Sequence, residues 1–314
     1  MTYFINSTAD YHRHDLNSLG WELTVCNALE PADSPCRPLL SAPASFGHNL
    51  SLFLKKIFPF DEIRTVLEIG GGMGYLMRDF LTFHPHLQAK MIDISPYLLN
   101  RQKEVLKSFN VDFELADILT VPISALSDFD LTIMNENLGD LPTLVAGPEA
   151  EDTPSENVDG VLKKIKAFNK RYSLALGTNE NEHINIGALE TVEKLCLAGI
   201  KYIYLSEHSC EAVVSEDVKP YMSFTSPGIP EMISLKGHSE FTIKFSYLQK
   251  IAEMLNYRTR RGSFADFLPL NLSDRVKTAL RLQTPHNDEQ EIIKQFVYDL
   301  FKYEYLILIQ GDRT

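Results

Sequence analysis

Short apolar runs alternate with amphipathic segments along most of this chain. Val66, Leu67 and Ile69 form an apolar strand, and Tyr75 to Phe83 has helical periodicity. The same pattern predicts further strands at 89–94, 111–115, 130–134, 201–205, 257–261 and 303–309, and helices at 96–109, 187–197, 246–255 and 291–301. Strands that alternate with helices predict an α/β fold, a doubly wound sheet that binds ligands at the carboxyl ends of its strands.

The segments around this pattern suggest how the chain is organised. Residues 1–60 precede the alternating region and are expected to form a helical extension or cap, most clearly at 44–58. Residues 61–314 then form the main domain, with insertions near 147–185 and 211–240. The acidic composition of 147–160 predicts a mobile loop, and the prolines of 211–240 predict irregular structure.

The most informative chemistry follows the first strand, where four glycines occur within five residues. Glu68 precedes Gly70, Gly71, Gly72 and Gly74, and a helix follows. Glycine lets a backbone approach a ligand closely and adopt positive φ angles. The dinucleotide spacing fails, because its third glycine would fall on Tyr75 or Met77, and no Gly-Lys-Ser/Thr of a P-loop follows.

Glu68-x-Gly70-x-Gly72-x-Gly74 resembles the first motif of the class I S-adenosylmethionine (SAM) methyltransferases. The resemblance implies a seven-stranded, mostly parallel Rossmann-like sheet with an antiparallel last strand. It also implies SAM as cofactor and S-adenosyl-L-homocysteine as product. The alternative is a tight turn in some other α/β fold.

Polar residues at the ends of the next strands extend the predicted cofactor site. Asp93, beside Ile94, can accept both ribose hydroxyls. The resemblance implies that Asp117, beside Ile118, meets the adenine amino group. The predicted cofactor-binding residues are therefore Glu68, Gly70, Gly71, Gly72, Gly74, Asp93, Ile94, Asp117, Ile118 and Asn135.

The predicted catalytic residues, Asn135 and Glu136, follow the fourth strand. The resemblance places the methyl acceptor here, where a carboxylate could hold a guanidinium or an amine by a charge-assisted hydrogen bond. The acceptor is a small molecule or a protein arginine or amine. The alternative role for Glu136 is a favourable interaction with the dipole of the helix that follows it.

A narrower resemblance concerns the MidA family of arginine methyltransferases, which assist assembly of respiratory complex I. Asn135-Glu136 followed by Asp140-Leu141-Pro142 is similar to that family's Asn-Glu…Asp-Ala-Leu-Pro stretch. The segment 237–248 is similar to the segment that follows the fifth strand in that family. The spacing between Glu136 and Asp140 is longer here, and Lys244 stands where the family has a histidine.

Two other functions remain as alternatives. Spermidine synthases share the glycine loop, but they have aspartates where this chain has Met73, Asn135 and Asn137. A non-catalytic SAM-binding sensor or assembly factor is the second, because methyl transfer requires no obligatory catalytic side chain. Release of S-adenosylhomocysteine in the presence of acceptors separates these alternatives.

Composition and net charge limit which kinds of binding partner are expected. A formal net charge of −12 argues against a nucleic-acid partner, which usually requires a basic face. No apolar run of 18 residues suggests a membrane span, and we expect a cytoplasmic protein with reduced thiols. The oligomeric state is open, with a homodimer among the alternatives.

No metal-ligand spacing occurs among the cysteines and histidines, so no metal is predicted. His208 and His238 are expected near the acceptor side of the sheet. His12 and His14 lie far from every motif and carry no prediction.

Overall fold

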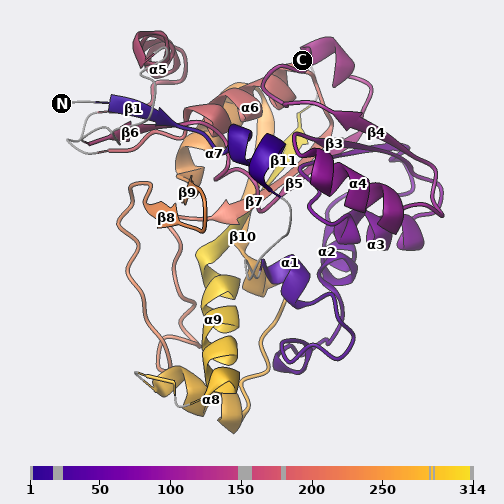
Figure 1. The fold of residues 1–314 in the computed structure, drawn as a ribbon, viewed down its shortest axis with the longest axis vertical. Coiled ribbons are helices and arrows are strands. Elements are labelled where there is room, and N and C mark those ends of the chain that lie inside the picture. The colour runs from indigo at the N-terminus through magenta and orange to yellow at the C-terminus, as the bar shows by residue number, and fades with distance from the viewer. Residues whose placement is uncertain are drawn as a thin grey trace.

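A computed structural model describes residues 3–16, 24–147, 158–177, 182–282, 284–285 and 287–311. At its centre is a seven-stranded sheet with the order β10-β11-β7-β5-β2-β3-β4 (Figure 1). Its strands are β2 Thr65–Ile69, β3 Gln88–Asp93, β4 Val111–Leu115, β5 Leu131–Asn135, β7 Tyr202–His208, β10 Tyr257–Ser263 and β11 Tyr303–Gln310. Only β11 runs antiparallel to both of its neighbours, β7 and β10, and the other pairs are parallel. The predicted fold class is confirmed.

Side-chain alternation along the strands divides the apolar core into two clusters, one on each face of the sheet. Val66 belongs to one cluster and Leu67 to the other, as do Tyr305 and Leu306 on β11. The first cluster includes residues of α2, α3, α8 and α9, and the second includes residues of α5, α6 and α7. The helices are α1 Val25–Ala28, α2 Phe46–Leu54, α3 Tyr75–Phe83, α4 Pro96–Val105, α5 Val158–Tyr172, α6 Ile186–Leu197, α7 Phe245–Met254, α8 Asp274–Arg281 and α9 Asp288–Lys302.

The extension at residues 1–60 is only partly helical, which corrects the prediction. It begins with a strand, β1 (Tyr3–Asn6), which pairs antiparallel with β6 (Thr143–Ala146) just beyond β5 (Figure 1). A π-helical turn, Tyr11–Asp15, follows, and α1, a 3-10 turn at Arg37–Leu39 and α2 come later. The pattern of apolar positions could not predict β1, because its pairing partner lies more than 130 residues away in sequence.

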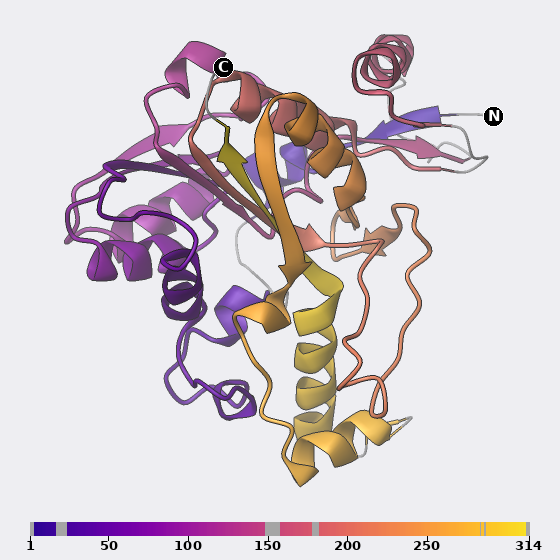
Figure 2. The ribbon, with the colours of Figure 1, turned by 180° about the vertical axis from the view of Figure 1, so that it is seen from behind.

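The predicted insertions differ in how much the structure describes. Residues 148–157 of the predicted acidic loop lie outside the described residues, and α5 begins directly after them. The segment 211–240 is largely irregular and ends in a hairpin of β8 (Met232–Ser234) and β9 (Ser239–Phe241). Seen from behind, α9 extends away from the sheet with α8 at its far end (Figure 2). Of the helices in the described ranges, none is long and apolar enough to cross a membrane.

Candidate functional site

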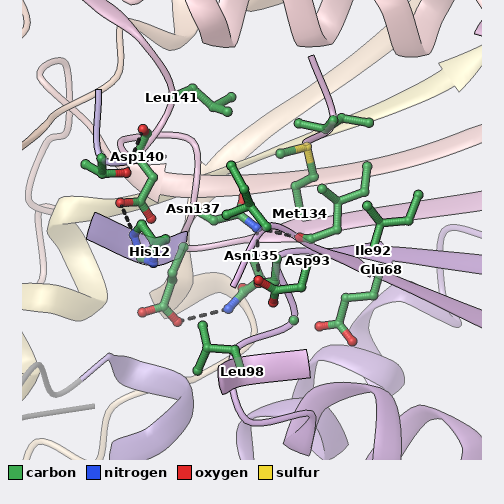
Figure 3. A pocket seen from close by; sticks show the side chains of 18 of the residues that line it. His12, Glu68, Ile92, Asp93, Leu98, Met134, Asn135, Asn137, Asp140 and Leu141 are labelled. Atoms are coloured by element: carbon green, nitrogen blue, oxygen red, sulfur yellow. Dashed lines mark hydrogen bonds and ion pairs between the residues drawn. The ribbon is translucent and has the colours of Figure 1, made fainter. Parts of the chain in front are cut away.

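A cavity lies at the carboxyl ends of the central strands, where the fold predicts a ligand. Figure 3 shows Asp93, Asn135 and Asn137 near its centre, with His12 and Asp140 on one side and Glu68 on the other. All but one of the predicted site residues line this cavity: Glu68, Gly70, Gly71, Gly72, Asp93, Ile94, Asp117, Ile118, Asn135 and Glu136. Gly74 does not line it, and instead forms the N-cap of α3 in a left-handed conformation with φ 85°.

The glycines of the loop are required for different reasons. A Cβ at Gly70 would collide with Asn137, and a Cβ at Gly71 would collide with Met91. Gly72 has φ 52°, and a Cβ built there meets no atom of the described residues within 4 Å. Packing therefore restricts Gly71, packing and a left-handed backbone at φ 64° together restrict Gly70, and at Gly72 the left-handed backbone and the open cavity impose the restriction.

Asp93 is held at the end of β3 by a short network. Its carboxylate accepts a hydrogen bond from the Ser95 backbone N–H (2.8 Å) and another from the Gln102 side-chain amide (2.7 Å). Burial raises the pKa of Asp93 to about 6, although these two hydrogen bonds act to lower it. Ser95 also accepts a hydrogen bond from the Leu98 N–H, so the same turn begins α4.

Gln102 is a site residue that the sequence did not reveal. It is fully buried on α4, and its amide also donates to the carbonyl of Gly72 (3.0 Å). One side chain thus joins Asp93 to the glycine loop. A glutamine inside an amphipathic helix carries no sequence signal for this role, because both of its partners belong to other elements.

We expect Gln102→Leu to weaken SAM binding, because it leaves the Gly72 carbonyl and one Asp93 oxygen without their donor. The cost of unpaired buried acceptors is about 1–3 kcal/mol, shared between folding and binding. Calorimetric titration with SAM measures the loss in binding free energy, and denaturant unfolding measures the loss in stability. Gln249→Leu is the matched control on α7, where the side chain bonds Glu253 and Thr259 away from the cavity. Equal SAM affinity in both variants would contradict a positioning role.

Glu68 and Asp117 differ in solvent exposure and in hydrogen bonding. Glu68 is 2% exposed, and its Oε2 atom has no hydrogen-bond partner among the described residues. Burial, together with the charge of Asp93, raises the pKa of Glu68 to about 8. Asp117 is more accessible, and it accepts hydrogen bonds from the Leu119 N–H (2.9 Å) and the Arg13 guanidinium (3.1 Å). The N-terminal extension therefore reaches the predicted adenine end of the cavity.

Asn135 and Glu136 connect the end of β5 to the extension. The Asn135 amide donates to Glu136 (3.0 Å) and its carbonyl oxygen accepts from Ser206 (2.8 Å). Glu136 has φ 55° and accepts from the backbone N–H groups of Val25 (3.1 Å) and Cys26 (3.3 Å). It therefore interacts with the N-terminus of α1, a helix earlier in the chain, and not with a helix after it. Burial raises its pKa to about 7 despite these hydrogen bonds.

A second polar group borders the cavity, and the sequence did not predict it. His12 and Asp140 both line the cavity, with Nε2 of His12 2.9 Å from Oδ1 of Asp140. Burial acts to lower the pKa of His12, but the hydrogen bond and charge of Asp140 outweigh it and raise the pKa. His238 lies against His12, with ring centroids 5.7 Å apart. His208 is elsewhere, stacked on Tyr303, and does not line the cavity.

Comparison with known proteins agrees with this architecture. Residues 66–146 match the family model described as "Methyltransferase domain". The fold is similar to that of an uncharacterised protein from Burkholderia thailandensis, with a TM-score of 0.55, 14% sequence identity, and coverage of 99% of this chain and 89% of that one. A structure from the same superfamily and organism, bound to S-adenosyl-homocysteine, gives a TM-score of 0.51 at 14% identity and the same coverage. No protein of curated function matches the sequence.

The matched segment begins in β2, ends in β6 and contains the glycine loop, Asp93, Asp117 and Asn135. The structural neighbours, at 14% sequence identity, bear on the fold alone. The family match and the seven-stranded topology together indicate a class I SAM-dependent methyltransferase.

Proposed function

We propose that this cavity binds SAM and that the chain transfers its methyl group to a basic nitrogen. The observation that supports the proposal is convergence: the glycine loop, Asp93, Asp117 and Asn135 come from successive strand ends and line one cavity. In this arrangement Asp93 would hold the ribose, Asp117 would bind the adenine, and the loop at Gly72 would leave room for the rest of the cofactor.

The charge of the cavity wall supports a cationic acceptor. Among the described residues, the carboxyl groups that line the cavity are those of Glu68, Asp93, Asp117, Glu136, Asp140 and Glu240, and neither lysine nor arginine lines it. Glu68, with its pKa raised to about 8, is mostly protonated at neutral pH, so the negative charge comes from the other groups. Such a wall favours positively charged ligands, which include the SAM sulfonium and a guanidinium or amine. The MidA resemblance adds support for protein arginine within this class.

Bound SAM would supply an already activated methyl group, so the protein's tasks are alignment, exclusion of water and removal of a proton from the acceptor. Glu136 suits the last task, because a group with a pKa of about 7 can accept a proton near neutral pH. Its hydrogen bonds to α1 and Asn135 fix the direction of the carboxylate.

The direct test is incubation of the protein with SAM and a panel of acceptors. The panel contains arginine peptides, lysine peptides, small amines and hydroxyl compounds. We expect S-adenosylhomocysteine to form with a basic nitrogen acceptor, and mass spectrometry to locate the methyl group on it. SAM binding without turnover would instead support a sensor, methylthioadenosine would indicate aminopropyl transfer, and methylation of hydroxyl compounds alone would overturn the acceptor class.

We expect Glu136→Gln to leave SAM affinity within about twofold of the wild type, and to lower kcat at least tenfold, about 1.4 kcal/mol or more of transition-state stabilisation. The amide cannot accept the proton, and its NH2 group faces one N–H group of α1 while its carbonyl oxygen still accepts from the other. Because a lost helix cap costs about 0.5–2 kcal/mol, thermal unfolding is measured alongside. A parallel loss of kcat and SAM affinity would place Glu136 in the cofactor site.

A further inference from the structure

Three segments that are distant in sequence meet at one edge of the cavity. His12 lies on the π-helical turn, Asp140 follows β5, and His238 lies in the turn between β8 and β9. One ring nitrogen from each histidine and one carboxylate oxygen of Asp140 all lie within 4.8 Å of one another. Pairing of β1 with β6 and a hydrogen bond from Thr8 to the Asp140 carbonyl (3.0 Å) hold the first segment there.

His238 has the hydrogen bonding of a histidine prepared to bind a metal ion. Its side chain is 4% exposed, and its Nε2 lies 3.0 Å from Oε1 of Glu240. Because a carboxylate accepts the Nε2 proton, Nδ1 is the nitrogen that carries the lone pair. That Nδ1 atom is buried and has no hydrogen-bond partner among the described residues. Tyr11 stacks on the ring, with centroids 4.2 Å apart, and fixes its plane.

We propose that His12, Asp140 and His238 form a binding site for a divalent transition-metal ion of the Zn²⁺ type. Two imidazoles and one carboxylate suit such an ion, whereas Mg²⁺ and Ca²⁺ prefer oxygen ligands. In the metal-bound form, the ion takes the place of the proton that His12 and Asp140 share. Glu240 stays outside the coordination sphere and orients His238.

Such an ion would connect the N-terminal segment to the loop after β5 and to the β8–β9 hairpin. His12, Asp140 and Glu240 all line the cavity, so the ion would complete its wall at this edge. Three protein ligands leave at least one coordination position for water or another ligand. Metal binding at these residues does not depend on which acceptor the protein uses.

The test is titration of the chelator-treated full-length protein with Zn²⁺ and, separately, with Co²⁺, whose visible absorption reports its ligands. We expect one equivalent to bind, with a rise in Tm, and no binding of Mg²⁺ at the same concentrations. His12→Ala and His238→Ala should each lose at least tenfold in Zn²⁺ affinity. His14→Ala, an exposed histidine two positions from His12 on the same turn, should bind as the wild type does.

Glu240→Gln provides a test that keeps every ligand in place. Loss of the orienting carboxylate should weaken Zn²⁺ binding by about 10–100-fold in a protein with an unchanged circular dichroism spectrum. Absence of Zn²⁺ binding to the wild type would overturn the proposal, as would wild-type Zn²⁺ affinity in the folded His12→Ala and His238→Ala proteins. SAM affinity, measured separately, tests the proposed function independently of the metal.

Discussion

Replacing Gly72 with valine should reduce SAM affinity by more than about a hundredfold, or about 2.7 kcal/mol. The left-handed backbone at φ 52° is costly for any residue with a Cβ, and most costly for a β-branched one. In the part of the chain that the structure describes, no atom lies within 4 Å of the added Cβ, so the valine side chain would occupy space in the cavity. Calorimetric titration of the folded variant measures the loss.

Gly228→Val is the matched control for this substitution. Gly228 has φ 73°, a Cβ added there also meets no atom within 4 Å, and the residue does not line the cavity. Both variants should therefore suffer similar backbone strain, and only Gly72→Val should lose SAM. A folded Gly72→Val protein with wild-type affinity would sink the assignment of the cofactor to this loop.

Removal of the Asp93 carboxylate should weaken SAM binding by about 1–3 kcal/mol, roughly 5- to 150-fold, since the ribose hydroxyls lose their acceptor. Asp93→Ala also removes the partner of Ser95 and Gln102, so Asp93→Asn is measured beside it. Asp112→Ala, an exposed carboxylate on β4, is the control and should bind normally. Unchanged affinity in both Asp93 variants would mean that the ribose partner lies elsewhere.

The pKa of Asp93, raised to about 6 by burial, gives the same interaction a pH dependence. Ribose hydroxyls donate best to the ionised carboxylate, so SAM affinity should rise with pH through about 6 and fall below it by up to tenfold per unit. Glu68, His12 and Asp140 are the other ionisable groups around Asp93. Asp93→Asn should therefore flatten the part of the profile near pH 6, and a wild-type profile that is already flat there would refute this account.

Local sequence predicted which residues of the glycine loop and the β3 end line the cavity, because each of these parts lies within a few residues of a strand end. Val66 to Gly74 contains the strand, the turn and the first helical cap, so no distant contact is needed to recognise it. Asp93 can be recognised in the same way, because it lies at the end of the predicted strand that became β3. Whether these residues bind SAM as expected stays a prediction that the variants above test.

The other side of the cavity could not be predicted in this way. The proposed role of His12 depends on its contacts with Asp140 and His238, which lie 128 and 226 residues away in sequence. Neither spacing matches a local motif. In the sequence, Gln102 is one polar position in an amphipathic helix. Its contacts with Gly72 and Asp93 are visible only in the folded structure. For Glu136, the sequence offers a helix that follows it as the alternative contact, whereas α1 of the extension supplies the N–H groups that it binds.

The pairing of β1 with β6 also constrains the order in which the molecule can be completed. Tyr3 pairs with Ala146, so the first strand cannot find its partner on the ribosome until nearly half of the chain has been made. The cost of closing so long a loop is lowered once β2 to β5 are folded, because they shorten the effective chain between the two ends. The glycine loop can therefore form before His12 arrives, so the part of the cavity wall that His12 contributes can be added after it.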